Sequence, residues 1–267
     1  MDATVNDVLM ALETIAPAAL AESWDNVGLQ VGSRQWPVKR VLTALDLTPE
    51  VMAEARHRQA DALVMHHPLI FSPLRAVDLD TPVGGCLQEL LHHQIAVMSA
   101  HTNLDSVTGG VNDVLASHLK VDHLTVLQPL AAQPNCGLGR VGSLPDRTTL
   151  ADLAVAIKSR MVLPHIRYAG NPHLSIQRVA LCSGSGSGLL DAFFASGAQV
   201  YITGDVRYHE AREVEARGLG VIDIGHYESE HIILESLAKQ LADQLVAGGL
   251  DVAVAACLNE QAPFKTV

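Results

Sequence analysis

Residues 62–68, Ala-Leu-Val-Met-His-His-Pro, decide the fold class of this chain. Four consecutive apolar residues predict a short strand that is buried on both faces. This strand ends at His66 and His67. The same pattern recurs at Ile95–His101 and, with one intervening glycine, at Leu219–His226. Buried strands that end at histidine therefore recur along the chain.

Helical periodicity separates these strands. Apolar residues recur every three or four positions over Val5–Ile15, and helices are also predicted over Pro82–His93 and Val111–Leu119. Thr48 can cap a further helix that has Pro49 at its first position. Strands that alternate with helices predict an α/β fold with mixed, largely parallel sheets.

The strand–helix rhythm occurs twice, which predicts two similar layered α/β domains. Between them, Gln128–Gly137 carries two prolines and no periodicity, so we expect a domain boundary there. In the second half, strands are predicted at Arg140–Leu144, Arg178–Cys182 and Val200–Thr203, and a helix over Val206–Arg217.

Composition limits the possible functions. The net charge of −11 and the lack of a Lys/Arg cluster argue against a broad nucleic-acid-binding face, although a small anionic substrate fits a local metal site. Four widely spaced cysteines form no C-x-x-C pair. Neither a signal peptide nor a stretch of about 18 apolar residues is recognisable, so we expect a cytoplasmic protein without a membrane span.

Histidines at several strand ends are expected to converge, because ligands of open α/β sheets bind at the carboxyl ends of strands. Asp105 stands four residues after His101, and Glu230 stands four after His226, which puts the latter pair on one helix face. Several imidazoles and two carboxylates suit two divalent ions, with zinc, manganese, iron, cobalt and nickel all compatible. The candidate metal ligands are His66, His67, His101, Asp105, His226 and Glu230.

A single histidine at a strand end is usually a surface or hydrogen-bonding residue. The conjunction of an adjacent pair with two His-x-x-x-carboxylate pairs is what favours a metal site. Apart from His209, the other histidines are assigned to surface or hydrogen-bonding positions: His57, His92, His93, His118, His123, His165, His173 and His231.

Five ordered motifs resemble one known family, the Nif three-like dinuclear metal-centre proteins, whose members are named as type 2 GTP cyclohydrolase I homologues. The resemblance covers essentially the whole chain. The motifs are SWDNVGLQVG (Ser23–Gly32), LVMHHPLIF (Leu63–Phe71), SAHTNLD (Ser99–Asp105), YITGDVRYH (Tyr201–His209) and GHYESE (Gly225–Glu230).

This resemblance implies that the five candidates other than His101 ligate metal, while His101 is either a direct ligand or a supporting residue. It also implies a toroidal homohexamer, and a last long helix, from about Ser229 to Leu245, that returns to the first domain. The expected domains are therefore residues 1–127 with 226–267, and residues 128–225.

Two functions remain open. In the first, the chain is a metal-dependent hydrolase in which a two-metal site supplies hydroxide near neutral pH. Glu230 and His101 are the candidate general bases, and the resemblance implies a nucleotide substrate whose guanine ring is opened. In the second, the metal site belongs to a non-enzymatic ring scaffold or regulatory protein.

Three motifs keep two interpretations each. Ser183–Gly188 is either a tight turn or an anion-binding loop. Asp205, with His209 nearby, either contacts substrate or caps the following helix. Trp24–Asn26 either lines a pocket or closes a turn.

Overall fold

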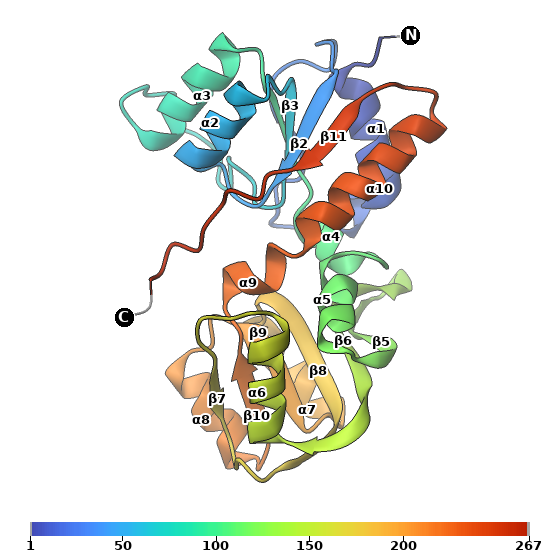
Figure 1. The fold of residues 1–267 in the computed structure, drawn as a ribbon, viewed down its shortest axis with the longest axis vertical. Helices are drawn as coiled ribbons and strands as arrows, with labels where there is room; N and C mark the ends of the chain where they lie inside the picture. Colours follow the sequence, from blue (N-terminus) through green and yellow to red (C-terminus); the bar gives the residue numbers. More distant parts are fainter. Residues whose placement is uncertain (1, 266–267) are drawn as a thin grey trace. The chain divides into compact units, whose positions relative to one another are not determined.

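The chain folds into two units, each with its own sheet, in a computed structural model that describes residues 2–265 (Figure 1). Unit 1 contains the described residues up to Leu104 together with Leu234–Gln261. Unit 2 contains Asp105–Ile233 and the described residues from Ala262 on. Both sheets carry helices, so the expected α/β class is confirmed.

The sheet of unit 1 has the strand order β1-β4-β3-β2-β11. All its pairs are parallel except β1 with β4. Its strands are β1 (Gly28–Val31), β2 (Arg40–Ala44), β3 (Ala62–Met65), β4 (Ala96–Ser99) and β11 (Ala253–Ala256).

Helices cover both faces of this sheet, with α2 and α3 on one side and α1 and α10 on the other (Figure 1). Thr48 and Thr81 begin α2 and α3, and each threonine oxygen accepts a backbone N–H of the first turn. As expected from the resemblance, the last long helix belongs to unit 1 from Leu234 on. The helices are α1 (Val5–Ile15), α2 (Pro49–His57), α3 (Pro82–His92), α10 (Ile233–Ala247) and the short η1 (Ala18–Leu20). The chain leaves unit 1 within α4 (Thr102–Ser106).

Unit 2 is built on a sheet with the order β5-β6-β8-β9-β10-β7. Only β8, β9 and β10 run parallel to one another, and the outer pairs are antiparallel. The strands are β5 (Asp122–Leu130), β6 (Gln133–Thr149), β7 (Arg167–Ala169), β8 (Ser175–Ser185), β9 (Val200–Gly204) and β10 (Gly220–Asp223). The helices are α5 (Val111–Leu119), α6 (Leu150–Arg160), α7 (Leu190–Ala195), α8 (Tyr208–Ala216), α9 (His226–Glu230) and the short η2 (Ser187–Leu189).

The stretch Gln128–Gly137 does not separate domains as expected. It contains the end of β5 and the start of β6, which pair as an antiparallel hairpin. The two prolines are compatible with this pairing because β5 is the edge strand of the sheet. The missing periodicity reflects exposure, since most side chains of β5 are exposed.

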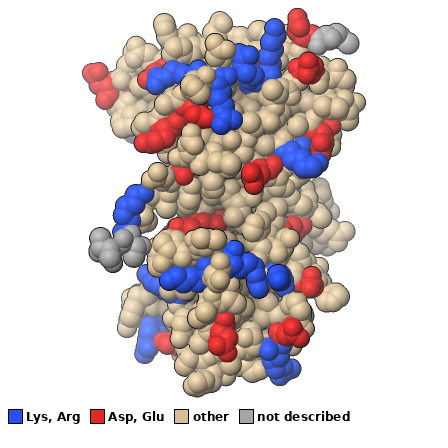
Figure 2. Space-filling view, in the orientation of Figure 1, with Lys and Arg blue, Asp and Glu red and all other residues tan. Residues whose placement is uncertain are grey.

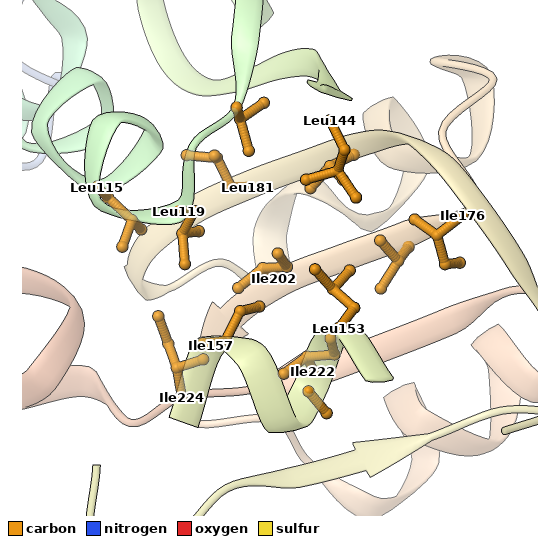
Figure 3. Packing of buried hydrophobic residues seen from close by; sticks show 14 of the residues in the cluster. Leu115, Leu119, Leu144, Leu153, Ile157, Ile176, Leu181, Ile202, Ile222 and Ile224 are labelled. Carbon is orange, nitrogen blue, oxygen red and sulfur yellow. The ribbon is translucent and has the colours of Figure 1, made fainter. Parts of the chain in front are cut away.

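The units also differ from the expected domain ranges. Residues 105–127 and 226–233, which were expected in the first domain, lie in unit 2. The reason is packing: Leu115 and Leu119 of α5 join the cluster that α6 forms with the sheet of unit 2 (Figure 3). Because α5 buries its apolar face in this cluster, it belongs to unit 2, although it was expected in the first domain.

The described surface carries no extended basic face on the side shown in Figure 2. Lys and Arg side chains gather there in small groups, with Asp and Glu nearby and uncharged atoms between them. Among residues 2–265, no helix has the length and apolarity needed to cross a bilayer.

Candidate metal centre

Three histidines come together at the carboxyl end of the sheet of unit 1. His66 and His67 follow β3, and His101 follows Ala100 at the end of β4. The two strands are parallel neighbours with Met65 opposite Ser99, so the residues that follow them emerge at the same edge. Each histidine offers one ring nitrogen, and these three nitrogens lie within 4.8 Å of one another.

The Nδ1 atom of each of these histidines already has a partner. Nδ1 of His66 donates to the carbonyl oxygen of Ala100 at 2.9 Å. His67 Nδ1 pairs with Asp46 Oδ1 at 2.9 Å. His101 Nδ1 pairs with Asp25 Oδ1, also at 2.9 Å. A neutral imidazole that donates from Nδ1 carries its lone pair on Nε2, so these bonds orient the ring and select the nitrogen that can bind a metal.

Of the two carboxylate partners Asp25 is the more enclosed, with a side chain that is 0% exposed against 52% for Asp46. Its carboxylate accepts the His101 bond, the Thr102 backbone N–H at 3.0 Å and the Thr102 hydroxyl. Burial raises the pKa of Asp25, but the hydrogen bonds from His101 and Thr102 outweigh it and lower the pKa to about 2. Asp25 is therefore an anion under all ordinary conditions, and the Trp24–Asn26 motif does more than close a turn.

Asp46, the partner of His67, is positioned from the C-terminal part of the chain. The carboxylate of Glu260 accepts the backbone N–H of Asp46 at 2.8 Å and that of Leu45 at 2.9 Å. Glu260 is itself buried, and burial raises its pKa even though the two N–H donors act in the opposite direction. A segment far along the sequence thus fixes the backbone that carries the carboxylate of Asp46.

The other three candidate ligands come together in unit 2. His226 and Glu230 are the first and last residues of α9, and His226 Nε2 lies 3.0 Å from Glu230 Oε2. A carboxylate oxygen of Asp105 lies within 4.8 Å of one of Glu230. Asp105 and Glu230 are both buried, whereas His226 is 36% exposed at its side chain. As in unit 1, Nδ1 of His226 pairs with a carboxylate, that of Asp205 at 2.7 Å.

Asp205 therefore holds a histidine, and the cap of α8 is formed elsewhere. The N-cap residue of α8 is Arg207, whose backbone N–H donates to Glu210 at 2.9 Å. Asp205 has a φ of 55°, a left-handed conformation that non-glycine residues seldom adopt. Asp205 directly follows β9, which pairs with β10.

The Ser183–Gly188 run makes room for the carboxylate of Glu230. A Cβ atom on Gly184 would lie 2.1 Å from Glu230 Oε1 and 3.2 Å from His226 Nε2. The φ of Gly184 is +60°, which also favours glycine. Its N–H donates to Ser229 Oγ at 2.8 Å, while the N–H of Gly186 donates to Thr203 Oγ1. These two N–H groups donate to side chains of unit 2, so the run packs against the residues that surround Glu230.

Polar contacts also fix Asp105. Asn112 Nδ2 donates to its carbonyl oxygen at 3.0 Å, and Ser183 Oγ donates to its Oδ1 at 3.3 Å. The neighbouring thiol of Cys182 is buried, and burial together with the charges of Asp105 and Glu230 raises its pKa. Cys182 is therefore a neutral thiol, and the donors of this cluster are oxygen and nitrogen atoms.

The donor set fits a divalent metal of the transition series. Unit 1 offers three imidazoles with oriented rings, and unit 2 offers one imidazole and two carboxylates. Nitrogen and carboxylate oxygen suit zinc, manganese, iron, cobalt and nickel. Carboxylates that hold the far nitrogen of a ligating histidine are a regular feature of such sites.

Sequence reasoning did not single out Asp46, and it named Gly184 and Ser229 only as members of the Ser183–Gly188 run and the Gly225–Glu230 motif. Asp46 carried a usable signal, because it stands two residues after β2 and the strand-end rule applies to it as to the histidines. The contact between Gly184 and Ser229 carried no local signal, since the two residues stand 45 positions apart in the sequence.

Comparisons with known proteins agree with this architecture. A family model described as Duf34/NIF3 (NGG1p interacting factor 3) matches residues 3–263. A Clostridium perfringens protein named GTP cyclohydrolase 1 type 2 homolog is 36% identical over 241 residues, which cover 90% of this chain and 92% of the relative. A Streptomyces coelicolor protein of the same name is 36% identical over 258 residues, covering 94% and 90%.

Solved structures show the same fold. A hypothetical protein of Staphylococcus aureus superposes with a TM-score of 0.94 at 28% identity, and the match covers 100% of both chains. A Bacillus cereus protein related to NIF3 gives the same TM-score at 25% identity, again over 100% of both chains. With the family match spanning both sheets and every candidate ligand, the chain belongs to the Duf34/NIF3 family.

Proposed function

We propose that this chain is a hydrolase that depends on two divalent metal ions and acts on a small anionic substrate of the nucleotide class. The ions are held by all six candidate ligands: His66, His67 and His101 from unit 1, and Asp105, His226 and Glu230 from unit 2. Zinc, manganese, iron, cobalt and nickel all match these donors.

The observation that carries the proposal is the shared arrangement of the four histidines. Each pairs its Nδ1 with a carboxylate or a carbonyl oxygen, in both units. Ligating histidines almost always make such a bond. In unit 1, ring nitrogens of His66, His67 and His101 also lie within 4.8 Å of one another. The same arrangement makes His101 a candidate ligand equal to the others.

When bound, two divalent ions would supply Lewis acidity, which lowers the pKa of water and stabilises negative charge on a substrate. The chain supplies the proton transfers. His101 is a candidate base only where its Nε2 is not occupied by metal, because Asp25 stays anionic and would stabilise the imidazolium that forms when Nε2 takes a proton. Glu230 is the other candidate where one of its oxygens is not occupied by metal, since its carboxylate is buried beside His226.

The substrate class rests on the relatives. Curated relatives carry the name GTP cyclohydrolase 1 type 2 homolog, which suggests a purine nucleotide and an opening of its imidazole ring. Phosphoester or amide hydrolysis would need the same donors, so the reaction itself has to be found by screening.

The test starts from protein purified without a histidine tag, stripped of metal and reconstituted with Mn²⁺ or Zn²⁺. Elemental analysis is expected to give about two ions per chain. A screen of nucleotides and phosphoesters is expected to find turnover that metal removal abolishes. Less than one ion per chain after reconstitution would contradict the proposal.

Variants separate the ligands from other residues. Asp105→Ala and Glu230→Ala are expected to lose more metal than His101→Ala, because a carboxylate that bridges two ions serves both. His118→Ala is the matched control, since His118 is exposed and bonds only within its own helix, to the carbonyl oxygen of Val114. Equal retention of metal in all four variants would remove the assignment.

A further inference from the structure

Two exposed aromatic side chains stand together at the surface of unit 1. Trp24 and Phe71 are each 56% exposed, and their ring centroids lie 5.8 Å apart at an interplanar angle of 49°. The whole chain has only two tryptophans and four phenylalanines. An exposed pair of such scarce, strongly apolar rings is the kind of feature that marks a binding surface.

The pair is held in place by backbone contacts that do not involve the rings. Ile70, which precedes Phe71, donates its N–H to Gln30 Oε1 at 2.7 Å and accepts a bond from Asn26 Nδ2 at 2.6 Å. Gln30 Nε2 in turn donates to the carbonyl oxygen of Asn26 at 2.5 Å. Two hydrogen bonds thus fasten the segment of Phe71 to the segment of Trp24, and the third braces the latter, so the backbone that carries both rings is positioned before any ligand arrives.

The pair also adjoins the three-histidine cluster. The indole of Trp24 meets His101 edge to face, with ring centroids 6.0 Å apart and an interplanar angle of 75°. Asp25, the next residue after Trp24, accepts the Nδ1 bond of the same histidine. A flat molecule lying on the indole would therefore lie beside His101, at the rim of the cluster formed by His66, His67 and His101.

We propose that Trp24 and Phe71 form a stacking surface for a planar, conjugated ring of the substrate, such as a nucleobase. The geometry suits this occupant because an aromatic ring can stack on any nucleobase without specific hydrogen bonds to its edge. The proposal rests on the proposed function for the identity of the substrate, but the stacking surface can be measured without turnover.

The two tryptophans make the test direct, because Trp36→Phe leaves Trp24 as the single indole. This variant is titrated, metal-free and zinc-loaded, with guanosine, guanosine monophosphate and ribose 5-phosphate while tryptophan fluorescence is recorded. Both ligands that carry the guanine base are expected to quench the emission saturably, and ribose 5-phosphate is expected to leave it unchanged. Quenching by ribose 5-phosphate equal to that by the nucleotide, or no quenching in either form, would overturn the proposal.

Substitutions test the two rings separately. In the Trp36→Phe background, Phe71→Leu is expected to weaken ring binding roughly ten-fold, the size of one lost stacking contact. Phe264→Leu is the matched control, because Phe264 is 84% exposed and is not one of the pair. Equal affinity in the Phe71 variant and the control would contradict a role for Phe71.

Two further outcomes keep this inference distinct from the proposed function. Saturable ring binding in a protein that never turns over a substrate would refute the hydrolase and leave the stacking surface intact. Turnover with an unchanged KM in Trp24→Leu would refute the stacking surface and leave the hydrolase intact. Trp24 emission that acrylamide cannot quench would show the pair buried against another copy of the chain, which also overturns the proposal.

Discussion

Gly184 shows how one residue without a side chain shapes the acidic cluster of unit 2. An added Cβ would lie 2.1 Å from Glu230 Oε1, and Glu230 cannot withdraw easily because it is buried beside His226. The left-handed backbone of Gly184 adds a cost of about 1 kcal/mol for any other residue.

We therefore expect Gly184→Ala to weaken metal binding at least ten-fold, the scale found when the support of a ligand is lost. Competition against a chelating dye measures the affinity. Gly188→Ala is the control, since a Cβ there meets nothing within 4 Å and its backbone is not left-handed. Similar affinities in both variants would mean either that Glu230 is not a ligand or that its side chain can move away from the added Cβ without cost.

Asp25 gives the second prediction at this scale. Asp25→Asn keeps the shape of the side chain but replaces one carboxylate oxygen by a donor, which disturbs the bonds from His101 and Thr102. Metal affinity is expected to fall about 10- to 100-fold, the scale seen when a carboxylate that holds a ligating histidine is replaced.

Asp191→Asn, at an exposed residue of unit 2, is the control for the loss of one charge. Asp205→Asn should have a smaller effect than Asp25→Asn, because the Asp205 side chain is 53% exposed and that of Asp25 is 0% exposed. The reverse order would show that burial of the supporting carboxylate does not set its contribution.

At the scale of elements, the strand-end rule accounts for what the sequence could predict. Parallel strands β3 and β4 place His66 and His101 at one edge, and parallel β9 and β10 place Asp205 and His226 at another. Such positions are readable because a buried strand is an apolar run that stops abruptly.

Contacts over long sequence separations are not readable in this way. The strand predicted at Arg140–Leu144 lies within β6, but β5 and the first part of β6 were missed because an exposed edge hairpin carries no apolar run. α5 was placed in the wrong half because a helix on a boundary shows its apolar face but not the sheet that covers it. The bond of Glu260 to the segment after β2 spans more than 200 residues, and no local pattern indicates it.

Glu260 gives a prediction about how the C-terminal segment is attached to β2. The folded pKa of Glu260 lies above its ordinary value of 4.5, because burial outweighs the N–H donors. Between these two values the folded chain holds a proton that the unfolded chain has released, so the free energy of unfolding falls as pH rises. Glu260→Gln removes this contribution and keeps an amide oxygen that can accept from Leu45 and Asp46.

The difference in unfolding free energy, variant minus wild type, is therefore expected to rise as pH increases from about 4 to 7. Urea unfolding followed by tryptophan fluorescence reports on the correct part of the chain, because Trp24 and Trp36 both belong to unit 1, as Glu260 does. Glu235→Gln, at an exposed residue of α10, is the control. A difference that falls with pH would show that the N–H donors outweigh burial.

At the scale of the whole molecule, the question is whether the metal serves chemistry or assembly. Resemblance to the family suggests a ring of six chains, so light scattering is expected to give about six times 28.5 kDa. A stable species of 28.5 kDa at micromolar concentration would contradict this.

Metal removal then separates the hydrolase from the scaffold. Unit 1 has a core in which α2, α3 and the sheet bury Val51, Leu63 and Leu90, and unit 2 has two such clusters of its own. None of the candidate ligands belongs to these clusters, so each unit has enough apolar burial to stay folded without metal.

We therefore expect chelation to abolish turnover while circular dichroism and the mass of the assembly stay unchanged, and we expect Mn²⁺ or Zn²⁺ to restore the activity. The control is Asp105→Ala, which should behave like the chelated wild type and should not respond to added metal at the same concentration. If the assembly instead dissociates on chelation and reforms with metal, and no substrate is ever turned over, the ions hold the ring together. The four oriented histidines would then be parts of a structural joint, and the hydrolase would be refuted.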